Sequence, residues 1–266
     1  MLASALLCAL TLSLVSPAPT SSDSAGSKSK TSGLADNTEV IDQLLDRFAY
    51  TLRNRPGGLG RDPENGLVLL RELSGHFDAC GPRDRRDIVK AVVRGLERFD
   101  REEPAGLEFA MAAANALGSM GPESVDPLLS LVVDKHVDND LELHRRLVLS
   151  LGRTRNEDAL PRLEKLLHHE EATIEAAAAE AMGEFDGLEE AKRKEVFYAL
   201  LTRLIDAKFL ADQDEVDLTH QRRYEAIIGA MTTSLQRLSK HDERDPEQWL
   251  RFWNKNKRKP WRLAAS

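Results

Sequence analysis

The stretch that decides the fold is Leu151-Gly-Arg-Thr-Arg-Asn-Glu-Asp-Ala-Leu-Pro-Arg-Leu-Glu-Lys-Leu-Leu-His-His-Glu-Glu-Ala-Thr-Ile-Glu-Ala-Ala-Ala-Ala-Glu-Ala-Met-Gly183. Its ending, Glu180-Ala-Met-Gly183, recurs upstream as Leu149-Ser-Leu-Gly152 and Asn115-Ala-Leu-Gly118. The three endings are 34 and 31 residues apart, an interval typical of solenoids built from helix pairs. Because a solenoid presents a long surface, we expect its function to lie in exposed side chains.

The composition favours helices and argues against a general nucleic-acid binder. Aromatic residues make up 5% and charged residues 30% of the 266 residues, and runs of β-branched residues are scarce. Strands are rich in those residue types, so the profile favours an all-α chain. The formal net charge is −7, whereas a nucleic-acid-binding domain is usually basic.

Residues 1–18 are expected to form a signal peptide. Their apolar stretch is uncharged, too short to span a bilayer comfortably, and followed by small residues near Ala18. We therefore expect export to the periplasm or the extracellular space; the alternative is a membrane anchor formed by an uncleaved segment. Residues 19–36 are rich in Ser and poor in large apolar side chains, which predicts a disordered linker. Loss of Cys8 with the signal peptide leaves Cys80 alone, so no disulfide framework is expected.

From residue 37 onward the apolar residues recur at helical spacings of three and four. Over 37–186 the predicted helices are short and separated by Gly, Pro or Asp, which indicates a right-handed α-solenoid of antiparallel helix pairs. Over 187–245 two longer helices are expected to cap the open end of the stack, and 246–266 to form a terminal helix and tail. Gly118, Gly152 and Gly183 lie at predicted helix ends, where a C-cap favours a residue that tolerates positive φ.

The stretch Leu151–Gly183 resembles a HEAT-like repeat, of the kind also found in phycobilisome lyases. In that pattern a Leu-Gly opens the unit, D-x-x-A-L-P-x-L builds the first helix, and V-R-x-x-A-A-x-A-L-G builds the second. The resemblance is strong over Leu117–Gly183 and implies an all-α solenoid of HEAT-like repeats. The Arg that is frequent early in the second helix is replaced here by Glu175, and by His144 and Ala110 in the two preceding units. A continuous ladder of arginines is therefore not expected.

No cofactor, metal or small-molecule substrate is expected. His168-His169-Glu170-Glu171 has metal-ligand residue types, but adjacent histidines on a turn rarely converge on one ion, so we interpret the cluster as a polar turn. Deoxyhypusine hydroxylase is a HEAT-like solenoid that binds two irons through His-Glu pairs at the start of its second helices. The matching positions here hold Met111-Ala112, Arg145-Arg146 and Ala176-Ala177. Sequence motifs of other common catalytic sites are also missing.

The C-terminal segment interleaves all three tryptophans, Trp249, Trp253 and Trp261, with six basic residues between Arg251 and Arg262. Asp245-Pro246 is a good helix start, after which the aromatic residues share one face. We expect Trp249 and Trp253 to dock against the last repeat. The basic residues are either solvated or bind an anionic partner.

Taken together, the sequence predicts a non-enzymatic scaffold that binds another protein. We expect partner contacts on the face of the second helices or at the acidic loop Asp212–Asp217. One alternative is a peripheral binder of anionic surfaces, either membrane or nucleic acid, acting through the C-terminal tail; another is an accessory subunit of an enzyme complex. The candidate partner-binding residues are His144, Arg145, Glu175, Glu180, Lys255, Lys257, Arg258 and Lys259.

Overall fold

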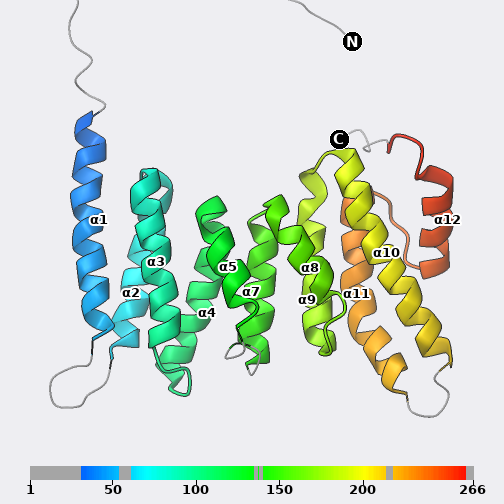
Figure 1. Ribbon diagram of the computed structural model, residues 1–266, viewed down its shortest axis with the longest axis horizontal. Helices are drawn as coiled ribbons and strands as arrows, with labels where there is room; N and C mark the ends of the chain where they lie inside the picture. Colours follow the sequence, from blue (N-terminus) through cyan, green and yellow to red (C-terminus); the bar gives the residue numbers. More distant parts are fainter. Residues whose placement is uncertain (1–30, 54–60, 135–136, 138–139, 214–217, 262–266) are drawn as a thin grey trace, which may run out of the picture.

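A computed structural model describes residues 31–53, 61–134, 137, 140–213 and 218–261. Within these ranges the chain is all-α and contains no β-strand. The helix pairs follow one another from α1 and α2 at one end to α10 and α11, and α12 lies beside α10 at the far end (Figure 1). The predicted all-α solenoid is therefore confirmed.

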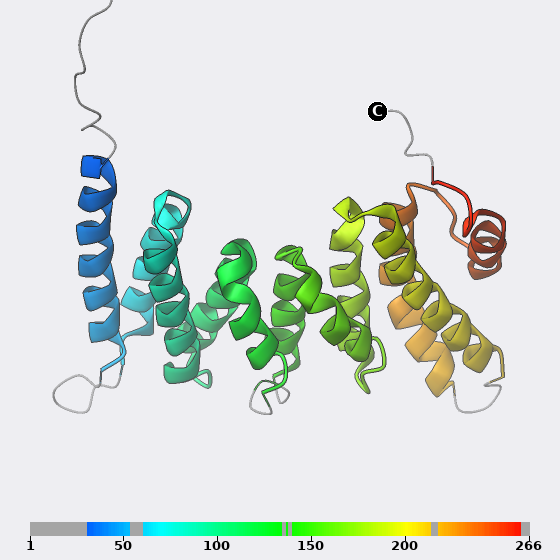
Figure 2. The ribbon, with the colours of Figure 1, turned by 45° about the horizontal axis from the view of Figure 1, so that its top comes forward.

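The described residues form five antiparallel helix pairs. The pairs are α1 (Thr31–Thr51) with α2 (Pro63–His76), α3 (Pro82–Arg98) with α4 (Pro104–Ser119), α5 (Val125–Leu131) with α7 (Leu141–Arg153), α8 (Leu160–Leu166) with α9 (Ala172–Gly183), and α10 (Glu190–Gln213) with α11 (Thr219–Ser239). The second helices α2, α4, α7, α9 and α11 each pack against the next in the series and so form one layer of the stack (Figure 2). A further helix, α12 (Pro246–Asn256), packs against α10.

The helices begin where the sequence offers a cap. The carboxylates of Asp62, Asp140 and Asp245 accept hydrogen bonds from backbone N–H groups in the first turns of α2, α7 and α12. Proline occupies the first turn of α2, α3, α4 and α12, where its missing N–H has no intrahelical partner to lose. The capping aspartates and first-turn prolines therefore determine where these helices begin.

The three recurring glycines do not act as the predicted C-caps. Gly118 and Gly152 lie inside α4 and α7, Gly183 has a φ of −64°, and the only glycine with positive φ among the described residues is Gly121. Each marks a point where the next second helix crosses closely. A Cβ on Gly118 would lie 2.9 Å from the Cβ of Ser150.

The same contact repeats along the layer. A Cβ on Gly152 would lie 2.6 Å from the Cα of Ala181, and one on Gly183 would lie 2.5 Å from the Oγ of Ser234. Ser150 and Ala181 each stand two residues before the glycine of their own unit. Ser234 of α11 takes the corresponding place, so the longer α10–α11 pair continues the stack although its sequence has lost the repeat ending.

The first helix begins six residues before the expected boundary at Asn37. The backbone of α1 is helical from Thr31, so the last part of the predicted linker 19–36 belongs to the helix. Extending an established helix adds one hydrogen bond per residue without a new nucleation cost. The predicted signal peptide and the rest of the linker lie outside the described residues.

Candidate binding surfaces

The layer of second helices contains four of the candidate partner-binding residues, and two of them are buried. His144 on α7 and Glu175 on α9 are 1% and 0% exposed. Both stand eight residues before the glycine of their unit, as Ala110 does in α4, and Ala110 is also buried. This position faces the inside of the stack. The prediction that His144 and Glu175 contact a partner directly is therefore wrong.

Glu175 is the centre of a buried ion-pair network. Its two carboxylate oxygens lie 2.7 Å from the Nε of Arg203 on α10 and 2.8 Å from the Nε of Arg223 on α11. A buried carboxylate is costly unless it is paired and hydrogen-bonded. Both arginines pair with the carboxylate, the Nε of Arg223 also donates a hydrogen bond to Oε2, and together they join α9 to both helices of the following unit.

The turn before α9 is held by the same two arginines. Arg203 Nε also donates to the backbone oxygen of Leu167, at 2.9 Å. The guanidinium of Arg223 donates to the backbone oxygens of His169 and Glu170. Sequence reasoning missed both arginines because they lie 28 and 48 positions beyond Glu175, and only the fold brings them there.

The His168–Glu171 segment has the geometry of a structural turn. The Nδ1 of His169 accepts a hydrogen bond from the backbone N–H of Glu171, at 3.0 Å. The ring of His169 also packs edge-to-face with the buried ring of His144, with centroids 5.4 Å apart. Within the part of the chain that the structure describes, no three His, Cys, Asp or Glu side chains are placed so that they could hold a metal ion together.

Arg145 and Glu180 lie on the accessible side of the layer. The side chains of Arg145 and its neighbour Arg146 are 36% and 34% exposed, and both pair with the exposed carboxylate of Glu142. Glu180 is exposed on α9. The positions equivalent to Arg145 are Met111 on α4 and Ala176 on α9, both partly exposed. The two arginines therefore stand on α7 between two helices with short or uncharged side chains.

Ion pairs tie the second helices together at one end. Glu184, which follows α9, accepts hydrogen bonds from Arg237 of α11 at 2.7 Å and from Arg155, which follows α7, at 3.1 Å. The hydrogen bond from Arg237, reinforced by Arg155, lowers the pKa of Glu184. Lys240, just beyond α11, pairs with Asp186 at 2.6 Å. These contacts fix the lateral order of three successive units.

The aromatic residues of the C-terminal segment dock against α10. The ring of Phe197 on α10 has its centroid 5.7 Å from Trp249, 5.7 Å from Trp253 and 5.1 Å from Trp261. Trp249 is completely buried and Trp253 is half-buried. The predicted docking of Trp249 and Trp253 on the last repeat is thus confirmed.

The basic residues of the same segment remain at the surface. Four side chains at and beyond the end of α12 are exposed and form no ion pair with the described part of the chain: Lys255, Lys257, Arg258 and Lys259. By contrast, the neighbouring Lys194 pairs with Glu190 at 2.6 Å. The backbone here is anchored, because Lys194 Nζ donates to the backbone oxygen of Lys259 at 2.7 Å.

Two further candidate features are the acidic loop and Cys80. Asp212, at the start of the predicted acidic loop, is exposed and pairs with Lys208 at 2.9 Å, while residues 214–217 lie outside the described ranges. Cys80 is buried and its Sγ donates to the backbone oxygen of His76 at 3.1 Å. Burial, together with the neighbouring carboxylate of Asp84, raises the pKa of the Cys80 thiol.

Comparison with known proteins agrees with the repeat architecture. Residues 136–208 match the family model of HEAT repeats. No curated protein and no solved structure shows significant similarity to the chain. The match supports a HEAT-like repeat protein, and HEAT repeats generally mediate contacts between proteins. The match does not separate the phycobilisome-lyase type from other HEAT repeats, so that finer resemblance stays a prediction.

Among the described residues, no helix combines the length and the apolar content that crossing a bilayer requires.

Proposed function

We propose that this protein is a non-enzymatic scaffold that binds another protein along the outer side of α4, α7 and α9. The observation that carries the proposal is the pair Arg145 and Arg146, whose side chains are about one third exposed on the middle helix of a regular layer. Arginine is enriched at protein interfaces and can bind carboxylates through two parallel hydrogen bonds. The uncharged positions on either side, such as Ala112 and Ala176, allow a partner to approach the two guanidinium groups.

The stacking supports this use of the surface. Close contacts at Gly118, Gly152 and Gly183 join four second helices through their backbones and short side chains. A surface fixed in this way has little conformational freedom to lose when a partner binds. Glu142 provides exposed negative charge beside the arginines, which would favour one orientation of the partner over others.

The test is affinity capture with the full chain and with a double charge reversal, R145E/R146E. We expect the variant to lose the partner that the unaltered chain retains, with affinity reduced at least about tenfold. The matched control is R83E/R86E on α3, which makes the same change in charge at exposed positions of the other layer. Equal loss of the partner by both variants would show that the layer of second helices is not the binding surface.

We also propose that the chain is exported and that its signal peptide is removed. The support is the uncharged apolar stretch of residues 1–18 followed by small residues. Sequencing the N-terminus of the protein isolated from its source should give a start at or near Pro19, directly after the expected signal peptide. A chain that retains Met1 in the membrane fraction would instead indicate the uncleaved anchor.

A further inference from the structure

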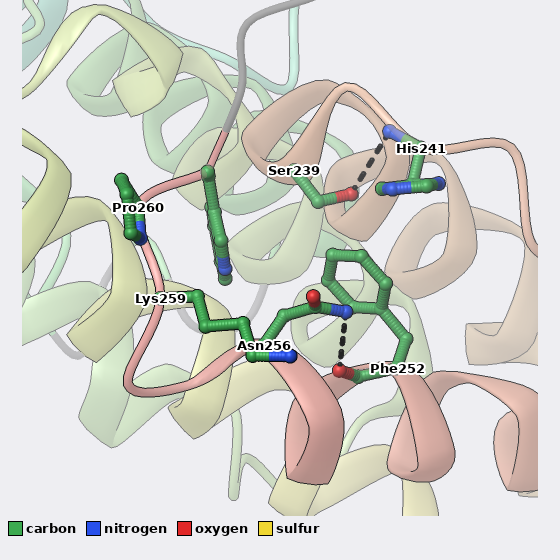
Figure 3. Close-up of a pocket in the computed structure, with 7 residues that line it drawn as sticks. Ser239, His241, Phe252, Asn256, Lys259 and Pro260 are labelled. Carbon is green, nitrogen blue, oxygen red and sulfur yellow. Dashed lines mark hydrogen bonds between the residues drawn. The ribbon is translucent and has the colours of Figure 1, made fainter.

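Two hollows adjoin along α12, on the side that faces the connection from α11. The first has a volume of about 420 Å³ and is lined by Ser239, His241, Phe252, Asn256, Lys259, Pro260 and Trp261 (Figure 3). The second has a volume of about 390 Å³ and is lined by His241, Glu243, Gln248, Arg251, Phe252, Lys255 and Asn256. The two hollows are neighbours that share three lining residues, His241, Phe252 and Asn256, and they are together called the α12 groove here.

The middle of the α12 groove is apolar and firmly held. Phe252 is 9% exposed, and its ring contacts the His241 ring edge-to-face with centroids 4.4 Å apart. Trp261 is 7% exposed and closes one end of the groove, where the cations Arg193 and Lys194 lie over its ring. A ligand would therefore meet a preformed aromatic surface.

The rim of the α12 groove is basic. Arg251, Lys255 and Lys259 line it, and Glu243 is the one carboxylate among the lining residues. Lys255 lies in the last turn of α12 and Lys259 lies three residues beyond its end, and neither pairs with a carboxylate of the described residues. Each of the two hollows is thus lined by one cation that has no carboxylate partner.

The groove also offers a hydrogen-bond acceptor for a peptide backbone. The side-chain amide of Asn256 donates to the backbone oxygen of Phe252 at 2.9 Å, which leaves its Oδ1 free to accept. Figure 3 shows Asn256 and Lys259 on one side of the hollow and Ser239 with His241 on the other. An extended chain lying between them could reach the amide and the ammonium groups together.

We propose that the α12 groove binds an acidic peptide segment of a partner protein, with an apolar side chain on Phe252 and flanking carboxylates at Lys255 and Lys259. This proposal rests on the scaffold function and adds a second binding site with a defined partner chemistry. Charge complementarity selects the acidic segment. The recessed aromatic floor selects an apolar anchor in it.

A membrane or a nucleic acid fits these observations less well. Interfacial binding to lipid needs aromatic side chains that can enter the bilayer, but Trp249 and Trp261 are buried and the apolar floor is recessed. A polyanionic nucleic acid carries a charge at every nucleotide, whereas the groove is lined by the carboxylate of Glu243 as well as by cations. A peptide can instead place its charges at chosen positions.

The test uses a fluorescein-labelled peptide that has one phenylalanine flanked on each side by three glutamates. Its binding to the full chain is followed by fluorescence anisotropy at physiological ionic strength, where screening limits long-range attraction to about 8 Å. The variant K255E/K259E alters the groove. The matched control K257E/R258E makes the same change in charge at exposed positions of the same segment that do not line the groove.

We expect K255E/K259E to weaken peptide binding at least about tenfold and K257E/R258E by less than about threefold. A peptide with serine in place of the phenylalanine should bind at least about tenfold more weakly. Equal losses in the two variants, or equal binding of the serine peptide, would overturn the proposal. So would tighter binding of anionic vesicles or of single-stranded DNA than of the peptide.

A second measurement uses only the unaltered chain. In a ¹H–¹⁵N spectrum the indole N–H signal of Trp261 should move on titration with the peptide, while that of the buried Trp249 should stay in place. Movement of neither signal would also count against the groove. Failure of this experiment leaves the Arg145–Arg146 surface unaffected, because that surface is tested by a different variant and a different partner.

Discussion

Substitution of Gly152 by alanine tests the close approach of the second helices. A Cβ at this position would lie 2.6 Å from the Cα and Cβ of Ala181 and 2.7 Å from its backbone oxygen. All three atoms belong to the rigid part of α9 and cannot rotate away. The two helices must therefore separate by several tenths of an ångström, which also disturbs the packing around the contact.

The expected effect can be worked out from two opposing contributions. Overpacking a well-filled site costs about 1–3 kcal/mol, whereas replacing glycine by alanine within a helix gains up to about 1 kcal/mol. We expect Gly152→Ala to lower the free energy of unfolding by about 1–2 kcal/mol. The matched control is Gly229→Ala in α11, where an added Cβ meets nothing within 4 Å; this variant should gain about 0.5–1 kcal/mol.

Urea denaturation followed by circular dichroism separates the two outcomes. With a slope of about 1–3 kcal/mol per molar urea, the midpoint for Gly152→Ala should fall by roughly 0.5–1 M and that for Gly229→Ala should rise. If both variants were equally stabilised, the helices would not approach as closely at Gly152 as described, and the explanation of the recurring glycines would be wrong.

Three further substitutions test the buried network, the pH dependence and the repeat core. Glu175→Gln should lower the free energy of unfolding by about 3–5 kcal/mol, because it leaves two arginines without their carboxylate, whereas the exposed control Glu180→Gln should change it by less than about 0.5 kcal/mol; chemical denaturation measures both. The pKa of Glu184 is lowered on folding, so its contribution is present above its unfolded value of 4.5 and is lost as the pH falls through the folded value. Glu184→Gln should therefore reduce the loss of thermal stability between pH 5 and pH 3, and an unchanged pH profile would contradict the assigned pairing. Leu163→Asp places an unpaired charge at a fully buried position and should abolish the cooperative thermal transition of the repeats; a retained melting temperature would refute its place in the core.

The repeat architecture could be predicted because its signals are local. Apolar spacing, the helix starts at Asp62 and Asp245, and the recurring Leu-Gly endings each depend on a few neighbouring residues. The reason for the glycines was predicted wrongly. A C-cap and a close helix crossing both favour glycine, and only the residue that packs from the next unit, such as Ala181 against Gly152, distinguishes them.

The buried polar positions show a second limit of the sequence. The general geometry of solenoids predicts His144 and Glu175 on an accessible face of the second helices, but both side chains are buried. A signal was present, since Ala110 occupies the same register and a small apolar residue there indicates an enclosed site. The arginines that compensate Glu175 could not be found in this way, because Arg203 and Arg223 belong to longer helices without the repeat ending.

The contacts that hold the stack explain why binding sites can lie on two separate parts of it. Along the second helices, crossings at backbone distance and the Arg155–Glu184–Arg237 ion pairs fix the position of each unit relative to the next. The surface that carries Arg145 therefore needs no partner to order it. At the C-terminal end, Phe197 and the tryptophans hold α12 against α10, which belongs to the other layer. Since different helices build the two proposed surfaces, binding at one would not require a partner to leave the other.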